Sequence, residues 1–286
     1  MNFSEIMPYQ QAAYSNGGSY LAISKDKEMF VFDADQLQIA HRFSFPDEVQ
    51  KIKWSPDDCF IMVVSTKTNT VHLRCVNNAV VEGQVDGWTG TIQDDMLAGA
   101  AWSSDSRQVL TFTDLQLRAT VWSLTEMAQT AFLKGPKLLP PQGMDFSSNG
   151  KFMCLAERRD CKDWISIYYA GHDWKMVNTF ETTETFDVAD CKWIMQNSAI
   201  LVQDNPLEPR FVIYAALTGN TIAIHTPKCN GGLGVRNLSI SPSSKLLACG
   251  TYDTTLVLYN NLTQTQVHEI DHVTSINLVP QTEDLH

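Results

Sequence analysis

The sequence lacks any long hydrophobic run. No stretch of eighteen or more apolar residues occurs among its 286 residues, whereas a helix needs about 20 such residues to cross a bilayer. Residues 1–10 also lack the basic start and the apolar stretch of a signal peptide. We therefore expect a soluble intracellular protein without membrane insertion.

An excess of basic residues is also missing. The 21 Lys and Arg residues are outnumbered by 32 Asp and Glu residues, which gives a formal net charge of -11. A chain of this charge repels a phosphate backbone rather than attracting it. Nucleic acid is therefore not an expected partner.

Closely paired cysteines and familiar catalytic motifs are absent as well. The seven cysteines form no Cys-x-x-Cys motif, and a secreted disulfide scaffold would show tighter, paired spacing. Most of them lie in apolar stretches, so we expect buried free thiols. The chain has no Gly-x-Ser-x-Gly motif and no P-loop. We expect a protein without catalytic residues, cofactor or metal.

What the sequence does contain is a long internal repeat. Six times, an apolar and mostly aromatic residue precedes a polar turn, at spacings of 40, 48, 44, 47 and 47 residues. Four-stranded β-propeller blades repeat at about 40–50 residues, and helical solenoid repeats are mostly shorter. The six anchors are Tyr14, Trp54, Trp102, Phe146, Trp193 and Ile240.

Each anchor is followed by two short apolar strands at nearly constant offsets, as at residues 60–64 and 70–74. The second strand contains the position of the signature Trp, while the signature aspartate survives only as Asp33. Because neighbouring blades bury their faces against each other, apolar strands can hold the fold while the polar signature degenerates. The sequence predicts an all-β, WD40-type β-propeller of about six degenerate blades, forming one domain over residues 1–286. The signature positions are Phe32, Arg74, Trp122, Tyr168, Tyr214 and Tyr259.

How the ring of blades closes is left open by the sequence. Residues 273–279 resemble the start of another blade that is not finished, and an unclosed ring exposes a strand edge. Either the chain closes as a small ring, or residues 273–286 begin a further blade, or a tail, in a larger ring.

The fourth repeat contains the most distinctive stretch. Residues 156–163 read Ala-Glu-Arg-Arg-Asp-Cys-Lys-Asp, where generic WD40 blades have a hairpin with Gly or Asp. With residues 1–5, 54–57, 117–124 and 239–244, this stretch closely resembles the centrosomal and spindle-pole WD-repeat family. The similarity extends to about Ile276, and family members continue beyond His286. The resemblance implies an N-terminal portion or a short form of such a protein.

The resemblance also implies a function. Family members are non-enzymatic scaffolds in the cytoplasm and cytoskeleton, at the centrosome, spindle pole or basal body. The implied partner is a long coiled-coil anchoring protein of the SSX-interacting type, with a minus-end-directed kinesin reached through the complex in fungi. The implied roles are spindle microtubule anchoring, centriolar satellite recruitment and cilium assembly.

The charged run of the fourth repeat is the candidate site of partner contact. It falls between two predicted strands, so we expect an exposed hairpin longer than the two-residue kind. Its charges either pair locally as a solvated loop or form a docking patch with an arginine hot spot. Replacing both arginines with glutamate is expected to abolish partner binding and to leave the fold intact. The candidate residues are Glu157, Arg158, Arg159, Asp160, Lys162, Asp163 and Trp164.

Two other motifs have competing interpretations. His268, Glu269 and His272 form an HExxH string, which binds zinc when both histidines project from one helical face, but the surrounding Thr and Val favour a strand. A zinc hydrolase is therefore a remote alternative, and a generic WD40 adaptor in ubiquitin ligation or trafficking is a nearer one. The pairs Ser55-Pro56 and Ser241-Pro242 fit turns, with phosphorylation as the alternative.

Overall fold

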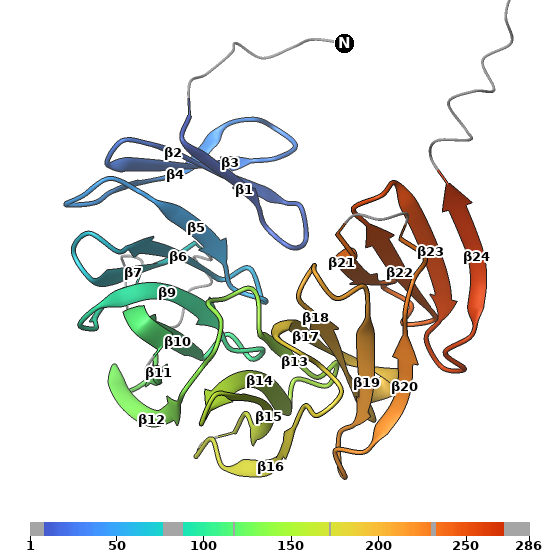
Figure 1. Cartoon of the computed structure of the whole chain (residues 1–286). Coiled ribbons are helices and arrows are strands. Elements are labelled where there is room, and N and C mark those ends of the chain that lie inside the picture. Colours follow the sequence, from blue (N-terminus) through green and yellow to red (C-terminus); the bar gives the residue numbers. More distant parts are fainter. Residues whose placement is uncertain (1–8, 77–87, 117, 172, 230–232, 272–286) are drawn as a thin grey trace, which may run out of the picture. The chain divides into compact units, whose positions relative to one another are not determined.

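The computed structural model describes residues 9–76, 88–116, 118–171, 173–229 and 233–271. The described chain is built of strands, with two short 3-10 helices at Asp114–Gln116 and Met195–Asn197. The strands form six four-stranded antiparallel sheets, each a meander of consecutive strands (Figure 1). The chain divides into two compact units, Met1–Pro140 and Pro141–His286, and we number the sheets one to six in chain order. The prediction of a single domain remains a prediction, and residues 273–286 lie outside the described residues.

The first unit contains sheets one to three, which follow one another along the chain. Its strands are β1 (Gln11–Tyr14), β2 (Tyr20–Lys25), β3 (Glu28–Asp33), β4 (Ile39–Ser44), β5 (Lys51–Trp54), β6 (Phe60–Ser65), β7 (Thr70–Cys75), β8 (Thr89–Gln93), β9 (Leu97–Trp102), β10 (Gln108–Thr113), β11 (Arg118–Ser123) and β12 (Ala128–Lys134).

The second unit contains sheets four to six, with the same order of strands in each sheet. Its strands are β13 (Met144–Phe146), β14 (Phe152–Arg159), β15 (Lys162–Tyr169), β16 (Met176–Glu181), β17 (Val188–Ile194), β18 (Ala199–Asp204), β19 (Phe211–Ala215), β20 (Thr221–His225), β21 (Val235–Ile240), β22 (Leu246–Thr251), β23 (Thr255–Asn260) and β24 (Gln266–Asp271).

The predicted repeat corresponds to these sheets. Each anchor lies at or next to the end of the first strand of its sheet, and the signature positions all lie on the third strand. The two apolar strands predicted after each turn are therefore the second and third strands, which pair with each other. The fourth strand of each sheet was not predicted. Its side chains are mostly exposed, as in β24, so it lacks the apolar run that marks the inner strands.

The core lies between successive sheets of each unit. In the first unit, Ala22 and Val31 of sheet one pack with Ile61 of sheet two, and a second cluster joins sheets two and three. In the second unit, β18 is buried along its whole length between the clusters shared with sheets four and six. Burial of each such Val, Leu or Ile side chain contributes about 1.5–3 kcal/mol. Apolar strands thus hold neighbouring sheets together, as the degenerate repeat predicts.

The polar turns after Trp54, Trp102 and Phe146 share one hydrogen-bond scheme. The Ser55 hydroxyl donates to Asp57 Oδ1 at 2.6 Å and accepts the Phe60 N–H at 2.9 Å. Ser147 makes the same two contacts, to Asn149 at 2.7 Å and from Phe152 at 2.9 Å. Ser55 is fully buried, so its Ser-Pro pair forms a turn, as the sequence favours.

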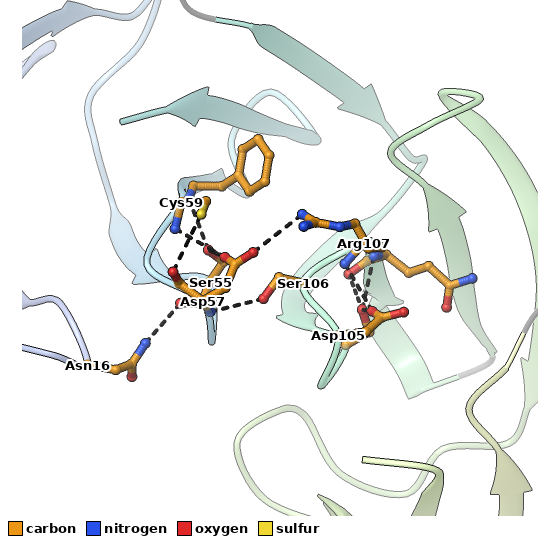
Figure 2. Close-up of polar contacts among 10 residues, drawn as sticks. Asn16, Ser55, Asp57, Cys59, Asp105, Ser106 and Arg107 are labelled. Carbon is orange, nitrogen blue, oxygen red and sulfur yellow. Dashed lines mark hydrogen bonds and ion pairs between the residues drawn. The ribbon is translucent and has the colours of Figure 1, made fainter. Parts of the chain in front are cut away.

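These turns also link neighbouring sheets of the first unit (Figure 2). Asn16 N and Nδ2 each donate to Asp58 Oδ1 at 2.7 Å, and Asn16 Nδ2 also donates to the Ser55 carbonyl at 2.8 Å. On the other side, the Asp57 N–H donates to Ser106 Oγ at 3.1 Å, and Arg107 pairs with Asp57 at 3.3 Å. The turns therefore fasten one sheet to the next along this edge.

None of the seven cysteines forms a disulfide, but they are less buried than the sequence predicts. Cys154, Cys191 and Cys249 are buried, three others are half-buried, and Cys161 is exposed. Cys161 is exposed because it stands in the turn of the β14–β15 hairpin.

Candidate partner-binding site

The charged run of the fourth repeat forms a tight hairpin, and the prediction of a longer loop is wrong. Strands β14 and β15 stay paired up to Arg159 opposite Lys162, which leaves only Asp160 and Cys161 in the turn. Both turn residues have positive φ values, 50° and 62°, as in the two-residue turns that match the twist of the strands. The two strands are longer than predicted because residues 157–159 pair with residues 162–164 in the antiparallel ladder.

The hairpin is also less exposed than predicted. Glu157 is fully buried and Asp163 is 7% exposed, so neither belongs to a solvated tip. Arg158, Asp160 and Lys162 lie at the surface. Arg159 and Trp164 are half-buried, so the seven predicted site residues range from buried to exposed.

Glu157 is the centre of a buried polar network. Its carboxylate accepts the Tyr168 hydroxyl at 2.6 Å and pairs with the Arg159 guanidinium. Arg159 also donates to Ser166 Oγ at 2.7 Å and lies over the ring of Trp164 at 5.5 Å. Burial and the bond to Glu157 raise the pKa of Tyr168 well above its usual value.

This network gives Arg159 a role in the fold. A buried carboxylate is costly unless it is paired and hydrogen-bonded, and Arg159 supplies the charge that Glu157 needs. Replacing Arg159 with glutamate would place a second carboxylate beside a buried one. The expectation that the fold tolerates this replacement therefore needs correction, and only Arg158 remains a surface arginine of the hairpin.

Arg158 connects sheet four to sheet five. Its Nη1 donates to Asp163 Oδ1 at 2.9 Å and to Asp187 Oδ1 at 3.0 Å. The other oxygen of Asp163 accepts the Val188 N–H at 2.8 Å, at the start of β17. The hairpin is thereby fixed against the connection between β16 and β17.

A second buried carboxylate, Asp204, orders that connection. It accepts the N–H groups of Phe186 and Asp187, both at 2.8 Å, and Arg210 Nε at 2.8 Å. Asp204 is fully buried at the end of β18. Sequence reasoning missed it, although an aspartate that directly follows the apolar run 199–202 and Gln203 is an unusual residue to bury.

Two large apolar side chains are exposed on the same edge. Phe186 is 76% exposed and Leu207 is 79% exposed. The pairings of Trp164 with Glu181 and of Val188 with Asp204 place both connections at the end of the sheets where the β14–β15 turn lies. We call this surface, made of Arg158, Asp160, Lys162, Phe186 and Leu207, the hairpin edge.

The hairpin edge combines features that interfaces favour. Exposed apolar anchors stand beside an arginine and a lysine, and the backbone around Phe186 is held by Asp204. Aromatic and arginine side chains are enriched among residues that dominate binding energy. The geometry therefore suits a protein partner, and the sequence did not predict Phe186 or Leu207 as part of it.

The HExxH string lies where the sequence predicts a strand. His268 and Glu269 belong to β24 and face Leu258 and Val257 on the neighbouring strand, so their side chains point to opposite faces. His272 lies outside the described residues. Among the residues that the structure describes, no three His, Cys, Asp or Glu side chains are grouped as metal ligands. The described helices include none that is long and apolar enough to cross a membrane.

Comparison with known proteins finds a matching family model and a similar protein. Residues 222–260 match the family model of the WD domain, G-beta repeat. The chain is 31% identical over 280 residues to the WD repeat-containing protein WRAP73 of Mus musculus, which covers 97% of this chain and 58% of that protein. The chain therefore spans less than two thirds of the length of this relative.

Solved β-propeller structures share the fold. The β-propeller domain of Cps50 (Swd1) from Myceliophteria thermophila superposes with a TM-score of 0.58 at 10% identity, covering 92% of this chain and 86% of that one. Hydrazine synthase of Kuenenia stuttgartiensis gives a TM-score of 0.60 at 12% identity, covering 91% and 85%. At these identities the likeness concerns the fold alone.

The six meander sheets, the repeat and these similarities define a WD-repeat β-propeller protein, which confirms the predicted fold class. Proteins of this class serve as scaffolds or adaptors. Within the class, the chain belongs to the WRAP73-type family of WD-repeat proteins, as the resemblance of its sequence indicates.

Proposed function

We propose that this chain is a non-enzymatic scaffold of the centrosome, spindle pole or basal body that binds a coiled-coil anchoring protein of the SSX-interacting type. A minus-end-directed kinesin joins through the resulting complex. The assembly anchors spindle microtubules, recruits centriolar satellite proteins and supports cilium assembly. The protein works in the cytoplasm, on the cytoskeleton.

The hairpin edge is the observation that supports this proposal most strongly. Residues 156–163 are the most specific segment of the resemblance to the centrosomal family. Arg158 and Lys162 lie at the surface on either side of the tight turn, and Arg158 bonds to Asp187, next to Phe186. A coiled coil offers a helical surface with apolar side chains flanked by alternating charges. Exposed apolar anchors flanked by cations and by Asp160 complement such a surface in both respects.

The test is affinity purification of the tagged chain from dividing cells, followed by mass spectrometry. We expect enrichment of a long coiled-coil centrosomal protein. Replacing Leu207 with aspartate introduces a charge at an exposed apolar residue of the edge and should reduce that enrichment at least about tenfold, since a buried hot-spot contact is worth about 2 kcal/mol or more. Phe186→Asp should act in the same way.

A matched control is available on the opposite edge of the same unit. Leu217 is 84% exposed and follows β19, so Leu217→Asp makes the same change at a site of similar exposure. The control should keep the coiled-coil protein. Recovery of ubiquitin-ligase or coat subunits without any coiled-coil centrosomal protein would overturn the proposal in favour of a different adaptor role.

A further inference from the structure

The Ser-Pro pair of sheet six lies in a turn that is open to solvent. Ser241 is half-exposed, and residues 242–246 after it are all exposed. The serines at the equivalent position of sheets one to four are buried, with at most 4% of their surface exposed. These serines are Ser15, Ser55, Ser103 and Ser147. The two Ser-Pro pairs of the chain, at Ser55 and at Ser241, therefore differ in their accessibility.

The hydroxyl of Ser241 also has weaker side-chain partners than that of Ser55. Ser55 Oγ donates to the carboxylate of Asp57 at 2.6 Å, and a hydrogen bond to a charged group is worth about 1.5–3 kcal/mol. In sheet six the corresponding residue is Ser243, whose Oγ lies 3.2 Å from Ser241 Oγ. Because no carboxylate of its own turn holds the Ser241 hydroxyl proton, this hydroxyl can react without losing such a bond.

The turn of sheet six is held only by its own sheet. The turn after Trp54 is fastened on one side by Asn16 and on the other by Ser106 and Arg107. Among the described residues, the hydrogen bonds of residues 241–245 all lie within sheet six and its turns, including those with Asn261. An exposed segment with few such contacts opens locally at low free energy. The turn can therefore open for an enzyme without breaking a hydrogen bond between sheets.

The surroundings of Ser241 also accommodate a phosphate group. A phosphoserine carries about −1.5 to −2 charges at neutral pH, and in the first unit Asp57 and Asp58 would repel it. Ser241 instead lines a pocket none of whose lining residues carries a charge. The main-chain N–H groups of Lys245 and Leu246 already donate to its Oγ, at 3.2 and 3.0 Å. These N–H groups and the ammonium of the exposed Lys245 are donors of the kind that stabilise a phosphate.

We propose that Ser241 is the acceptor site of a proline-directed serine kinase. Pro242 follows the acceptor directly, and the co-substrate is a nucleoside triphosphate that the kinase binds with Mg²⁺. The Ser241 hydroxyl attacks the γ-phosphorus, so the Oγ–P bond forms and the bond from this phosphorus to the bridging oxygen breaks. The hydroxyl proton passes to a carboxylate of the kinase, and the products are phosphoserine at position 241 and the nucleoside diphosphate.

The test is phosphorylation of the folded full chain by a cyclin-dependent kinase with MgATP, mapped by mass spectrometry of its peptides. We expect one phosphate, on Ser241. Ser55 should carry none and is the internal control in the same sample, because it also precedes a proline but is fully buried. A chain that takes up no phosphate, or that takes it up on Ser55, Ser243 or Ser244 instead, would overturn the proposal.

Variants of the turn separate the acceptor from its neighbours. Ser241→Ala should abolish phosphorylation, whereas Ser241→Thr, which keeps a hydroxyl before the proline, should retain it. Pro242→Ala should lower the rate at least about tenfold, since a site shaped for a larger apolar group discriminates by this order. Ser243→Ala is the matched control and should be phosphorylated like the wild-type chain. Full uptake by Ser241→Ala, or an unchanged rate for Pro242→Ala, would contradict the assignment.

This inference does not depend on the proposed centrosomal function. The turn after the first strand and the turn between the second and third strands lie at opposite ends of each antiparallel sheet, so Ser241 lies away from the hairpin edge. Purification of tagged Ser241→Ala should therefore recover the coiled-coil protein as the wild-type chain does. A wild-type chain that takes up phosphate on Ser241 but recovers no coiled-coil protein would overturn the proposed function alone.

Discussion

Sheets three and four each connect a buried carboxylate to the signature aromatic, but they place that carboxylate in different parts of the sheet. In sheet three, Asp94 precedes the first strand, and its carboxylate accepts the Thr111 hydroxyl at 2.5 Å. Thr111 in turn accepts the Trp122 indole N–H at 2.8 Å, and Trp122 stands at the signature position. A carboxylate, a hydroxyl and the signature aromatic thus form one chain of hydrogen bonds.

Sheet four performs the same task with a different set of residues. Its signature position is Tyr168, whose own hydroxyl reaches Glu157 directly. The carboxylate of sheet three precedes the first strand, whereas Glu157 lies on the second strand of sheet four. The hydroxyl of Ser166 accepts a hydrogen bond from Arg159. What is preserved is a buried, fully paired acceptor for the signature aromatic, not the residues that provide it.

The difference matters for function because the arginines that pair with the buried carboxylates contact different parts of the molecule in the two sheets. Asp94 is balanced by Arg118 within its own sheet, at 3.0 Å. Sheet four uses Arg159 for Glu157 and adds Arg158, which bridges to Asp187 before sheet five. The ion pairs of sheet four therefore hold Arg158 of the hairpin edge and the connection to sheet five, whereas those of sheet three stay within that sheet.

The largest effect is expected from Arg159→Glu, which breaks the network of sheet four. It leaves Glu157 buried beside a second carboxylate, so the free energy of unfolding should fall by about 2–4 kcal/mol, allowing for the partial exposure of Arg159. Urea unfolding of the purified chain measures this fall.

The control is Lys162→Glu, at the other end of the turn. Lys162 pairs with Glu181 at the surface, at 2.8 Å, so its replacement should cost less than about 1 kcal/mol. Equal effects of the two variants would show that Glu157 does not depend on Arg159.

Thr111→Val tests the corresponding network of sheet three. It removes the partner of both Asp94 and Trp122 while keeping the shape of the side chain, and should lower the free energy of unfolding by about 1–3 kcal/mol. Thermal or urea unfolding is the measurement.

Sheet three offers a matched control for this change. Thr120 is also fully buried, but its hydroxyl has no hydrogen-bond partner within the described residues. Thr120→Val should therefore be neutral or stabilising. If both variants were equally destabilising, the loss would come from packing rather than from the hydrogen-bond chain.

A smaller effect on the free energy of unfolding is expected when the pH falls from 7.5 to 5.5, because the usual pKa of histidine lies in this range and those of carboxylates lie below it. Burial lowers the pKa of His72 in sheet two, with the nearby Arg74 adding to the shift, and burial lowers the pKa of His225 in sheet five. The unfolded chain then binds protons more readily than the folded one below about pH 6.5. The stability that the neutral imidazoles contribute is present above that pH. It is lost as the pH falls through the lowered pKa values of these histidines in the folded chain.

Unfolding measured at pH 7.5 and 5.5 tests this directly. The wild-type chain should be less stable at pH 5.5, and His225→Phe should reduce the difference. A difference that is unchanged in His225→Phe and in His72→Phe would contradict the claim that these two histidines contribute to the pH dependence.

The sequence was sufficient for the inner parts of each sheet. The anchors and the two apolar strands after them repeat regularly, and burial between sheets requires those residues, so pattern and structure agree from Trp54 to Ile240. It was insufficient for the charged hairpin. The run of residues 157–163 reads as solvated because six of its residues are charged, and only the fold reveals that Glu157 and Asp163 are buried and paired with arginines. Likewise, only the fold shows that Ser55 is buried whereas Ser241 is half-exposed.

The most direct test of the central claim, that Glu157 and Tyr168 of sheet four replace the carboxylate and aromatic of sheet three, is a double-mutant cycle. Glu157→Gln and Tyr168→Phe, singly and together, should show a coupling energy of about 0.5–3 kcal/mol, as expected of residues in one buried network. The Asp94→Asn and Thr111→Val cycle of sheet three should give a value in the same range. Coupling in sheet three together with additive effects in sheet four, within about 0.3 kcal/mol, would contradict the account.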